Sequence, residues 1–354
     1  MRCSVLVPVL VALAASCSPP PPDRAPRLAG GGEGEGEGEG EGEGDPGEGE
    51  GEGEGEGEGE GEGEPGEGEG EGEGEGEGED FRSPGCGIDV DVDPDGNQDP
   101  ITSHALTVGG VVREYHLWAF DDYDPNEPKS LVFIYHGNTN RVQLPAGLRG
   151  RGFFDMERFV GRDAIIIYVD AENLSQEPNF VSWETLNVTG TNPDIQFFEA
   201  IVDDVRNNYC LDVRRTFAIG FSGGANFVNG LACHHAQLLT GLATYAGGFE
   251  ERHEGVLDLD ECDDVPVSAL SIHNVNDGPS PVSESDNAVA YYVDAAGCGL
   301  TRSDTSEPDC TAFDGCVGAQ VVQCRQVDPT DPNLAHEVWK PEGPPFVWDF
   351  FESL

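Results

Sequence analysis

The chain is 354 residues long and carries 69 acidic against 18 basic residues, which gives a formal net charge of −51 at pH 7. This excess argues against nucleic acid and anionic membrane surfaces as partners, because their negative charges would repel the protein. An almost pure Gly-Glu segment at 30–79 contributes part of the excess, yet the remainder of the chain is also strongly acidic.

Residues 1–16 have the pattern of a secretory signal peptide. Arg2 precedes an apolar run over 5–13, and small residues follow it. The run is too short to span a membrane. Residues 13–17 resemble the bacterial lipobox, so we expect a lipid on Cys17 after cleavage; the alternative is ordinary signal cleavage, which would release a free secreted protein. In both cases the protein is exported, to the outer cell surface or the extracellular medium.

Residues 17–80 are predicted to be a disordered linker. A Pro-rich stretch at 18–22 leads into the Gly-Glu segment, which has no apolar surface to bury and a dense row of like charges. Diffuse cation binding by the glutamates is an alternative role, but unstructured carboxylates bind divalent ions weakly. We therefore interpret the linker as a spacer before a single folded domain at 81–354, which is long enough to bury a substantial core.

Two features resemble metal sites, and neither matches fully. Residues 89–99, DVDVDPDGNQD, resemble a calcium loop, but the twelfth position counted from Asp91 is Thr102, where an EF-hand has a bidentate glutamate. A solvated acidic turn is the favoured interpretation. His234 and His235 are adjacent, and adjacent side chains diverge on a helix. We predict neither a metal nor a cofactor.

Strand and helix patterns alternate along the folded part. Alternating residues around a Gly-Gly pair predict an antiparallel hairpin at 107–120, and continuous apolar runs at 129–135 and 164–169 are typical of strands buried on both faces. This alternation predicts an α/β fold with a doubly wound, mostly parallel sheet and an antiparallel N-terminal hairpin. The later elements expected are a helix capped by Asn192, a strand at 267–272, a helix at 288–295, a cysteine-rich loop, a short strand at 319–322 and a final helix at 346–351.

The central motif is TFAIGFSGGAN at 216–226. An apolar strand leads into Gly-x-Ser-x-Gly, and an apolar helix pattern follows. In a sharp strand-to-helix turn of this kind the serine, here Ser222, is exposed as a nucleophile, and the N–H of Gly223 can hold an oxyanion. The alternative is a tight turn in a nucleotide-binding or purely structural α/β unit.

A serine nucleophile needs a base, and the base needs an acid that orients it. The α/β-hydrolase order is serine, then Asp or Glu, then histidine. Asp277 follows the next strand and His336 lies near the C-terminus, so we assign them as acid and base. Asp286 is the rival acid, and a surface-loop histidine is the alternative for His336. The second oxyanion N–H is expected from Asn138, in the loop after the first buried strand, with Thr139 close behind.

Eight cysteines remain when the signal peptide and Cys17 are set aside, and none forms a CxxC pair or a His-spaced zinc motif. Disulfides in an oxidising compartment are therefore expected. We predict that Cys210 pairs with Cys233, because one precedes the central strand and the other ends the central helix. Cys298 is expected to pair within the cluster at 310–324.

Four blocks of the folded part resemble the secreted polyhydroxybutyrate depolymerase and feruloyl esterase group: YHGNTN at 135–140, YCLDVRRTFAIGFSGGANFVNGLAC at 209–233, SIHNVND at 271–277 and AHEVW at 335–339. The resemblance implies the same nucleophile, acid and base, and a polymer-linked or aryl ester as substrate. The chain departs from the group at Asn274, where glycine is usual, and after Trp339, where proline is usual. Trp183 and Trp339 are candidates for an aromatic substrate platform; burial in the core is the alternative.

Taken together, the residues predict an exported, monomeric serine carboxylic ester hydrolase of the α/β-hydrolase fold. Two other functions remain open at this point. One is a cell-surface binding module on a hydrolase scaffold that has lost catalysis, and the other is a serine peptidase of the same fold.

Overall fold

The computed structural model describes residues 81–92, 101–140, 155–171, 180–185, 190–249, 262, 265–337 and 343–354. The predicted signal peptide, Cys17 and the Gly-Glu linker lie outside these residues, as does most of the acidic segment at 89–99. No helix in the described ranges is long and apolar enough to cross a membrane.

Ten strands of the described residues form one sheet in the order β1-β2-β5-β3-β7-β8-β9-β12-β11-β10. In this spatial order, the neighbouring strands β5, β3, β7, β8, β9 and β12 run parallel to one another. The strands at the two edges of the sheet, β1 and β2 on one side and β11 and β10 on the other, pair antiparallel. A separate short pair joins β4 (Thr139–Asn140) to β6 (Phe180–Val181). The strands of the large sheet are β1 (Ile101–Val108), β2 (Val111–Trp118), β3 (Lys129–Tyr135), β5 (Ala164–Val169), β7 (Leu211–Phe221), β8 (Gly241–Tyr245), β9 (Ser268–Asn274), β10 (Arg302–Asp304), β11 (Cys310–Phe313) and β12 (Val321–Gln326).

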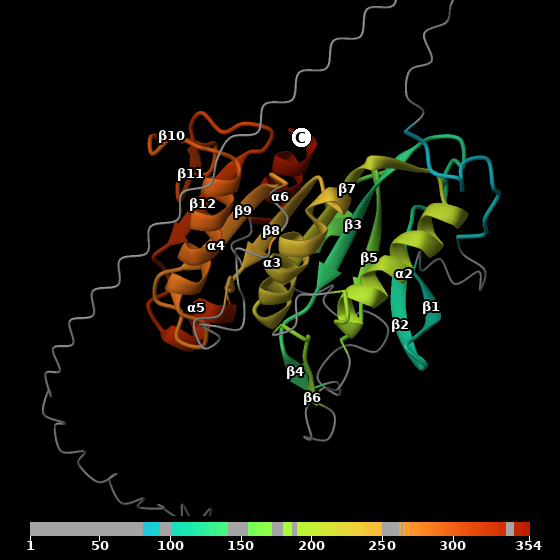
Figure 1. The fold of residues 1–354 in the computed structure, drawn as a ribbon, viewed down its shortest axis with the longest axis horizontal. Helices are drawn as coiled ribbons and strands as arrows, with labels where there is room; N and C mark the ends of the chain where they lie inside the picture. The colour runs from blue at the N-terminus through green and yellow to red at the C-terminus, as the bar shows by residue number, and fades with distance from the viewer. Residues whose placement is uncertain are drawn as a thin grey trace, which may run out of the picture. The chain divides into compact units, whose positions relative to one another are not determined.

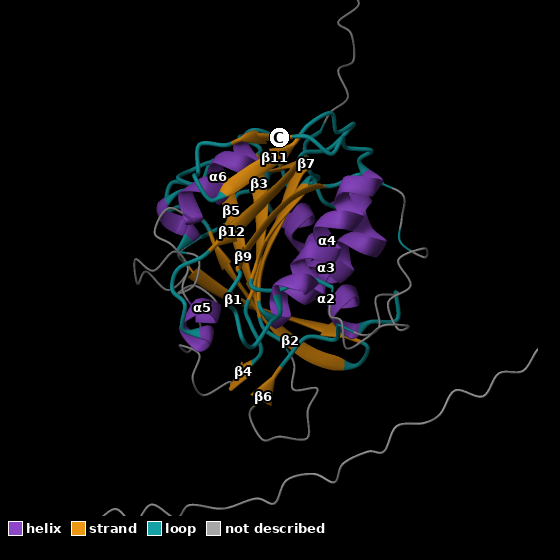
Figure 2. Ribbon diagram, turned by 90° about the vertical axis from the view of Figure 1, so that its left-hand side faces the viewer, coloured by secondary structure: helices purple, strands orange, loops and turns teal. Residues whose placement is uncertain are grey.

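Helices cover both faces of this sheet (Figures 1 and 2). On one face lie α2 (Pro193–Asn208), α3 (Gly223–His235) and α4 (Val282–Ala295), and on the other lies α6 (Gly343–Glu352). Three short helical segments complete the set: η1 (Met156–Arg158), η2 (Ala236–Leu238) and α5 (Pro332–Glu337). Because both faces are covered, β3, β5 and β9 are buried along their whole length.

The core is divided into two apolar clusters by the sheet. One joins the sheet to α2, α3 and α4, with Phe198, Phe227 and Tyr292 among its largest members. The other joins it to α6, where the ring of Phe351 stacks on Phe217 at 4.4 Å between centroids. The predicted mostly parallel sheet, the N-terminal hairpin and the final helix are all confirmed. The predicted cysteine-rich loop is wrong in part, because it contains the hairpin strands β10 and β11.

The start of α2 is fixed by the residues that the sequence indicated. The side chain of Asn192 accepts hydrogen bonds from the N–H groups of Asp194 at 2.8 Å and Ile195 at 3.3 Å, and Pro193 occupies the first helical position. These contacts satisfy amide groups that a helix otherwise leaves unpaired at its N-terminus.

Four disulfides occur among the described residues: Cys86–Cys210, Cys233–Cys262, Cys298–Cys316 and Cys310–Cys324. The predicted Cys210–Cys233 bridge is therefore wrong, whereas the pairing of Cys298 within the later cluster is confirmed. The reason is a contact between distant segments. The N–H of Ser83 bonds to Leu211 and the N–H of Gly85 bonds to Arg206, both at 2.9 Å, which brings Cys86 beside Cys210.

Loop length predicts which of these bridges stabilises the fold most. Cys86 and Cys210 are 124 residues apart, and Cys298 and Cys316 are 18 apart. The chain-entropy relation then gives about 5 kcal/mol for the first bridge and about 3 kcal/mol for the second. We expect the Cys86→Ser/Cys210→Ser variant to lose more unfolding free energy than the Cys298→Ser/Cys316→Ser variant in guanidinium titrations without reductant. The opposite ranking would contradict this reasoning.

Candidate active site

Ser222 lies at the sharp turn between β7 and α3. Its backbone has φ 53° and ψ −122°, a conformation that residues other than glycine rarely adopt. Two hydrogen bonds hold it there: the N–H of Ser222 donates to the carbonyl of Tyr245 at 2.9 Å, and the N–H of Asn226 donates to the carbonyl of Ser222 at 3.0 Å. This is the geometry of a nucleophile elbow, in which a strained turn exposes the serine hydroxyl.

Two glycines make this turn possible, because a side chain at either position would meet backbone atoms. A Cβ atom on Gly220 would collide with the carbonyl oxygen of Gly224, and a Cβ atom on Gly224 would collide with the carbonyl oxygens of Tyr135 and His136. Strand β3 therefore packs directly against the first turn of α3.

Replacing Gly224 by alanine should destabilise the protein by about 1–3 kcal/mol, because the atoms in the way belong to the backbone at the end of β3 and just after it and cannot rotate aside. Gly190→Ala is the matched control, since a Cβ atom there meets nothing within 4 Å. We expect thermal unfolding of the Gly190 variant to stay close to that of the wild type. Equal effects at both positions would contradict the packing argument.

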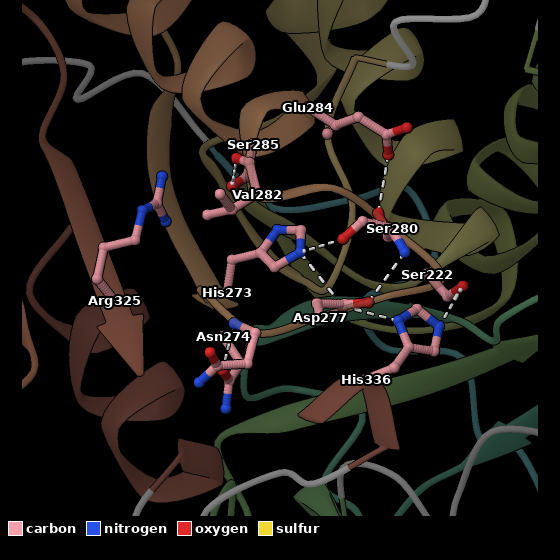
Figure 3. Close-up of polar contacts among 12 residues, drawn as sticks. Ser222, His273, Asn274, Asp277, Ser280, Val282, Glu284, Ser285, Arg325 and His336 are labelled. Carbon is pink, nitrogen blue, oxygen red and sulfur yellow. Dashed lines mark hydrogen bonds and ion pairs between the residues drawn. The ribbon is translucent and has the colours of Figure 1, made fainter. Parts of the chain in front are cut away.

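His336 connects the serine to a buried carboxylate (Figure 3). It lies on α5, with Nε2 at 3.0 Å from Ser222 Oγ and Nδ1 at 2.8 Å from Asp277 Oδ2. The side chain of His336 is 12% exposed, and that of Asp277 is fully buried. The loop that carries the acid is tied to α5, because the N–H of Gly278 donates to the carbonyl of Pro332 at 3.1 Å.

The carboxylate of Asp277 is surrounded by hydrogen-bond donors. Oδ2 lies 3.2 Å from His273 Nε2 as well as near His336, and Oδ1 accepts from the N–H of Ser280 at 2.9 Å. Burial raises the pKa of Asp277, but the hydrogen bonds from His273, His336 and Ser280 outweigh it and bring the pKa below its ordinary value. A buried anion in this place can orient the imidazole of His336 and stabilise its charged form.

The loop after β3 lies against the elbow. Asn138 is exposed, and its side chain covers Gly223, so that a Cβ atom there would collide with the amide group. A Cβ atom on Gly137 would lie 3.1 Å from Ser222 Cβ. The structure thus brings Gly223 and Asn138 together beside the serine, at the N-terminus of α3, where the helix dipole favours negative charge. Their role as oxyanion donors stays a prediction, and the side chain of Thr139 is not among those described.

The two tryptophans predicted as candidates for a substrate platform are Trp183 and Trp339, and the structure describes only the first. Trp183 is only 4% exposed, and its indole N–H donates to the carbonyl of His136 at 2.6 Å. Its ring packs against Tyr135 and Phe227, so the structure places it in the core and corrects its assignment to a substrate platform. Trp339 lies outside the described residues.

The other candidates do not join the site. Asp286, the rival acid, is on α4 and bonds to Gln323 at 2.9 Å and to Arg325. The ring of His235 lies 3.7 Å from Glu199. Among the described residues, no three His, Cys, Asp or Glu side chains converge in a way that could hold a metal ion. Sequence reasoning missed His273, which lies in the SIHNVND block four residues before Asp277; no motif gave it a role of its own.

Two known proteins are similar to this chain in sequence. Feruloyl esterase C of Emericella nidulans is 28% identical over 262 residues, which cover 72% of this chain and 89% of that protein. The probable feruloyl esterase C of Aspergillus niger is 30% identical over 192 residues, which cover 52% and 63%. No protein-family model matches the chain.

One solved structure bears on the fold. Acetyl xylan esterase from Aspergillus awamori superposes with a TM-score of 0.51 over 71% of this chain and 99% of that one, at 12% sequence identity. The parallel sheet, the elbow between β7 and α3 and this superposition agree, and the chain has the α/β-hydrolase fold.

Proposed function

We propose that the protein is a serine carboxylic ester hydrolase in which Ser222 is the nucleophile, His336 the base and Asp277 the acid that orients it. The observation that carries the proposal is the continuous chain of hydrogen bonds from the Ser222 hydroxyl through the imidazole to a buried carboxylate. The similarity to proteins named feruloyl esterase supports ester hydrolysis as the reaction class.

The reaction follows from the geometry in two steps. Ser222 Oγ attacks the ester carbonyl carbon while His336 Nε2 takes the hydroxyl proton, and the N–H groups of Gly223 and Asn138 hold the oxyanion of the tetrahedral intermediate. The intermediate collapses, His336 returns the proton to the departing alcohol, and an acyl-serine remains. Water then attacks this ester with the same base, releasing the carboxylic acid and the free serine.

We further propose that the substrate is an aryl or polymer-linked ester met outside the cytoplasm. The four disulfides of the described residues fit an oxidising compartment. Feruloyl esters are the first choice because of the names of the relatives, and polyhydroxybutyrate follows from the resemblance of the motifs. Acetylated polysaccharides are the third class to be tested. Attachment through Cys17 would hold the enzyme at the cell surface.

A substrate panel tests both the reaction and the substrate class. Purified protein is assayed on methyl ferulate, p-nitrophenyl acetate, acetylated xylan and a polyhydroxybutyrate suspension, with a panel of peptide p-nitroanilides for the peptidase alternative. We expect the highest kcat/KM on methyl ferulate and no peptide cleavage. No hydrolysis of any ester would reject the proposal.

A covalent probe separates an inactive scaffold from an unsuitable substrate. A fluorophosphonate reacts only with an activated serine, and mass spectrometry of the digested protein locates the adduct. We expect one adduct, on the peptide that contains Ser222. An unlabelled, inactive but folded protein would favour the binding-module alternative.

A further inference from the structure

His273 lies at the end of β9, behind the carboxylate of Asp277 as seen from His336 (Figure 3). Its imidazole is fully buried, and Nε2 lies 3.2 Å from Asp277 Oδ2 and 3.0 Å from the carbonyl oxygen of Ser280. Both oxygens accept hydrogen bonds. Nε2 must therefore carry a proton and share it between the two acceptors.

The surroundings of the other ring nitrogen, Nδ1, indicate whether the imidazole of His273 is neutral or charged. Among the described residues, Nδ1 of His273 has no hydrogen-bond partner. A proton on this atom would be a buried donor without an acceptor, which is unfavourable. The contacts therefore favour the neutral ring with its proton on Nε2.

Ser280 holds both members of this pair. Its carbonyl accepts from His273, its N–H donates to Asp277 Oδ1, and its hydroxyl donates to the buried carboxylate of Glu284 at 2.8 Å. Because Glu284 belongs to α4, the hydrogen bonds of Ser280 also fix the loop that carries Asp277 to this helix. Oδ2 of Asp277 is left between two N–H donors, one from His273 and one from His336.

We propose that His273 is a positioning residue for the acid: its neutral imidazole holds Asp277 Oδ2 in line with His336 Nδ1 and supplies a second hydrogen bond to this oxygen of the ionised carboxylate. The inference rests on the proposed function, because Asp277 has a role only if the site is catalytic. His273 acts through Asp277, since its polar contacts among the described residues are with Asp277 and the Ser280 carbonyl.

Other charged or titratable groups face this pair from four elements. Tyr245 comes from β8, Glu284 from α4 and His336 from α5. Arg325 on β12 is the register partner of His273 and directs its guanidinium to Asp286. The pH dependence of activity therefore reflects all of these side chains together. Only a difference in pH dependence between matched variants can be assigned to His273.

Nuclear magnetic resonance tests the geometry without any substrate. Histidine labelled with ¹⁵N distinguishes the two neutral tautomers and the charged ring, and loss of a signal in His273→Gln assigns the residue. At pH 7.5 we expect the neutral tautomer protonated on Nε2. A proton on Nδ1, alone or in a charged ring, would overturn the inference, and this arm gives its answer even if no ester is hydrolysed.

Kinetics test the positioning role with a matched pair of amides. The amide nitrogen of glutamine is as many bonds from Cα as His273 Nε2, whereas that of asparagine corresponds to Nδ1. His273→Asn should therefore lower kcat by about 10- to 100-fold, the cost expected for a catalytic group displaced by about 1 Å, with little change in KM. His273→Gln should recover most of this loss.

The acid limb of kcat/KM should also move to higher pH in His273→Asn, because the Asp277 carboxylate loses a hydrogen bond to its ionised form. His104→Gln on β1 is the control and should leave kcat and the pH profile unchanged. Equal losses in the Asn and Gln variants, or a loss in stability without a change in kcat, would show a structural role only. An inactive wild type would instead reject the proposed function.

Discussion

Replacing Ser222 by alanine should lower kcat for ester hydrolysis by about 10⁵- to 10⁶-fold, because the acyl-enzyme can no longer form. The remaining groups still bind the ester and its oxyanion, so KM should change little. Stability should also change little, because alanine meets the same positive φ as serine. Progress curves with methyl ferulate or p-nitrophenyl acetate at high enzyme concentration measure the residual rate.

Two further variants make this result specific. Ser222→Gly should be equally inactive yet no less stable than Ser222→Ala, since glycine adopts φ 53° without strain. Ser285→Ala removes another buried serine hydroxyl, which bonds to Val282 within α4, and should keep wild-type kcat. Retained hydrolysis in Ser222→Ala would mean that the nucleophile lies elsewhere.

The elbow and the start of α2 could be predicted because their requirements are local. Ser222 needs a preceding strand and small neighbours within a few residues, and the sequence contains all of them. The cap of α2 needs only Asn192 and two amide groups of the next turn. The parallel sheet follows in the same way from alternating segments, since each strand is buried by its own helix.

Contacts between distant segments could not be read from such patterns. The sequence favoured Cys233 as the partner of Cys210, whereas Cys86 pairs with it, because the backbone bonds of residues 83–85 hold Cys86 at the corner between α2 and β7. Trp183 was similarly ambiguous. Its burial depends on the carbonyl of His136 and on aromatic rings from other elements, none of which is near it in sequence.

The choice of the catalytic acid needed information from both the sequence and the structure. The order of residues allowed both Asp277 and Asp286, and the sequence favoured Asp277 because it follows the end of β9 more closely. The structure separates them by their neighbours, since one meets two imidazoles and the other meets Arg325. The second imidazole, His273, had no motif to reveal it, because a spacing of four residues across a strand end predicts no contact.

Asp277→Asn should lower kcat by about 10⁴-fold at neutral pH, the effect of this change in a serine-histidine-aspartate triad. The asparagine has one oxygen where the carboxylate uses two. If the oxygen faces His336 and His273, the amide nitrogen meets the N–H of Ser280. If it faces Ser280, the amide donates to His336 Nδ1, and the ring then carries its proton on Nε2 and cannot accept one from the serine.

The control for this variant is Asp286→Asn, which removes a carboxylate that accepts hydrogen bonds from the β12 side chains Gln323 and Arg325 and should keep wild-type kcat. Stability gives a second, independent test. Because the pKa of Asp277 is lower in the folded protein than its ordinary value, its ionisation favours folding above about pH 4. This contribution is lost as the pH falls through the folded-state pKa. The stability deficit of Asp277→Asn should therefore narrow as the pH falls below the ordinary pKa of an aspartate, and a deficit that does not change with pH would contradict a charged carboxylate at the centre of the site.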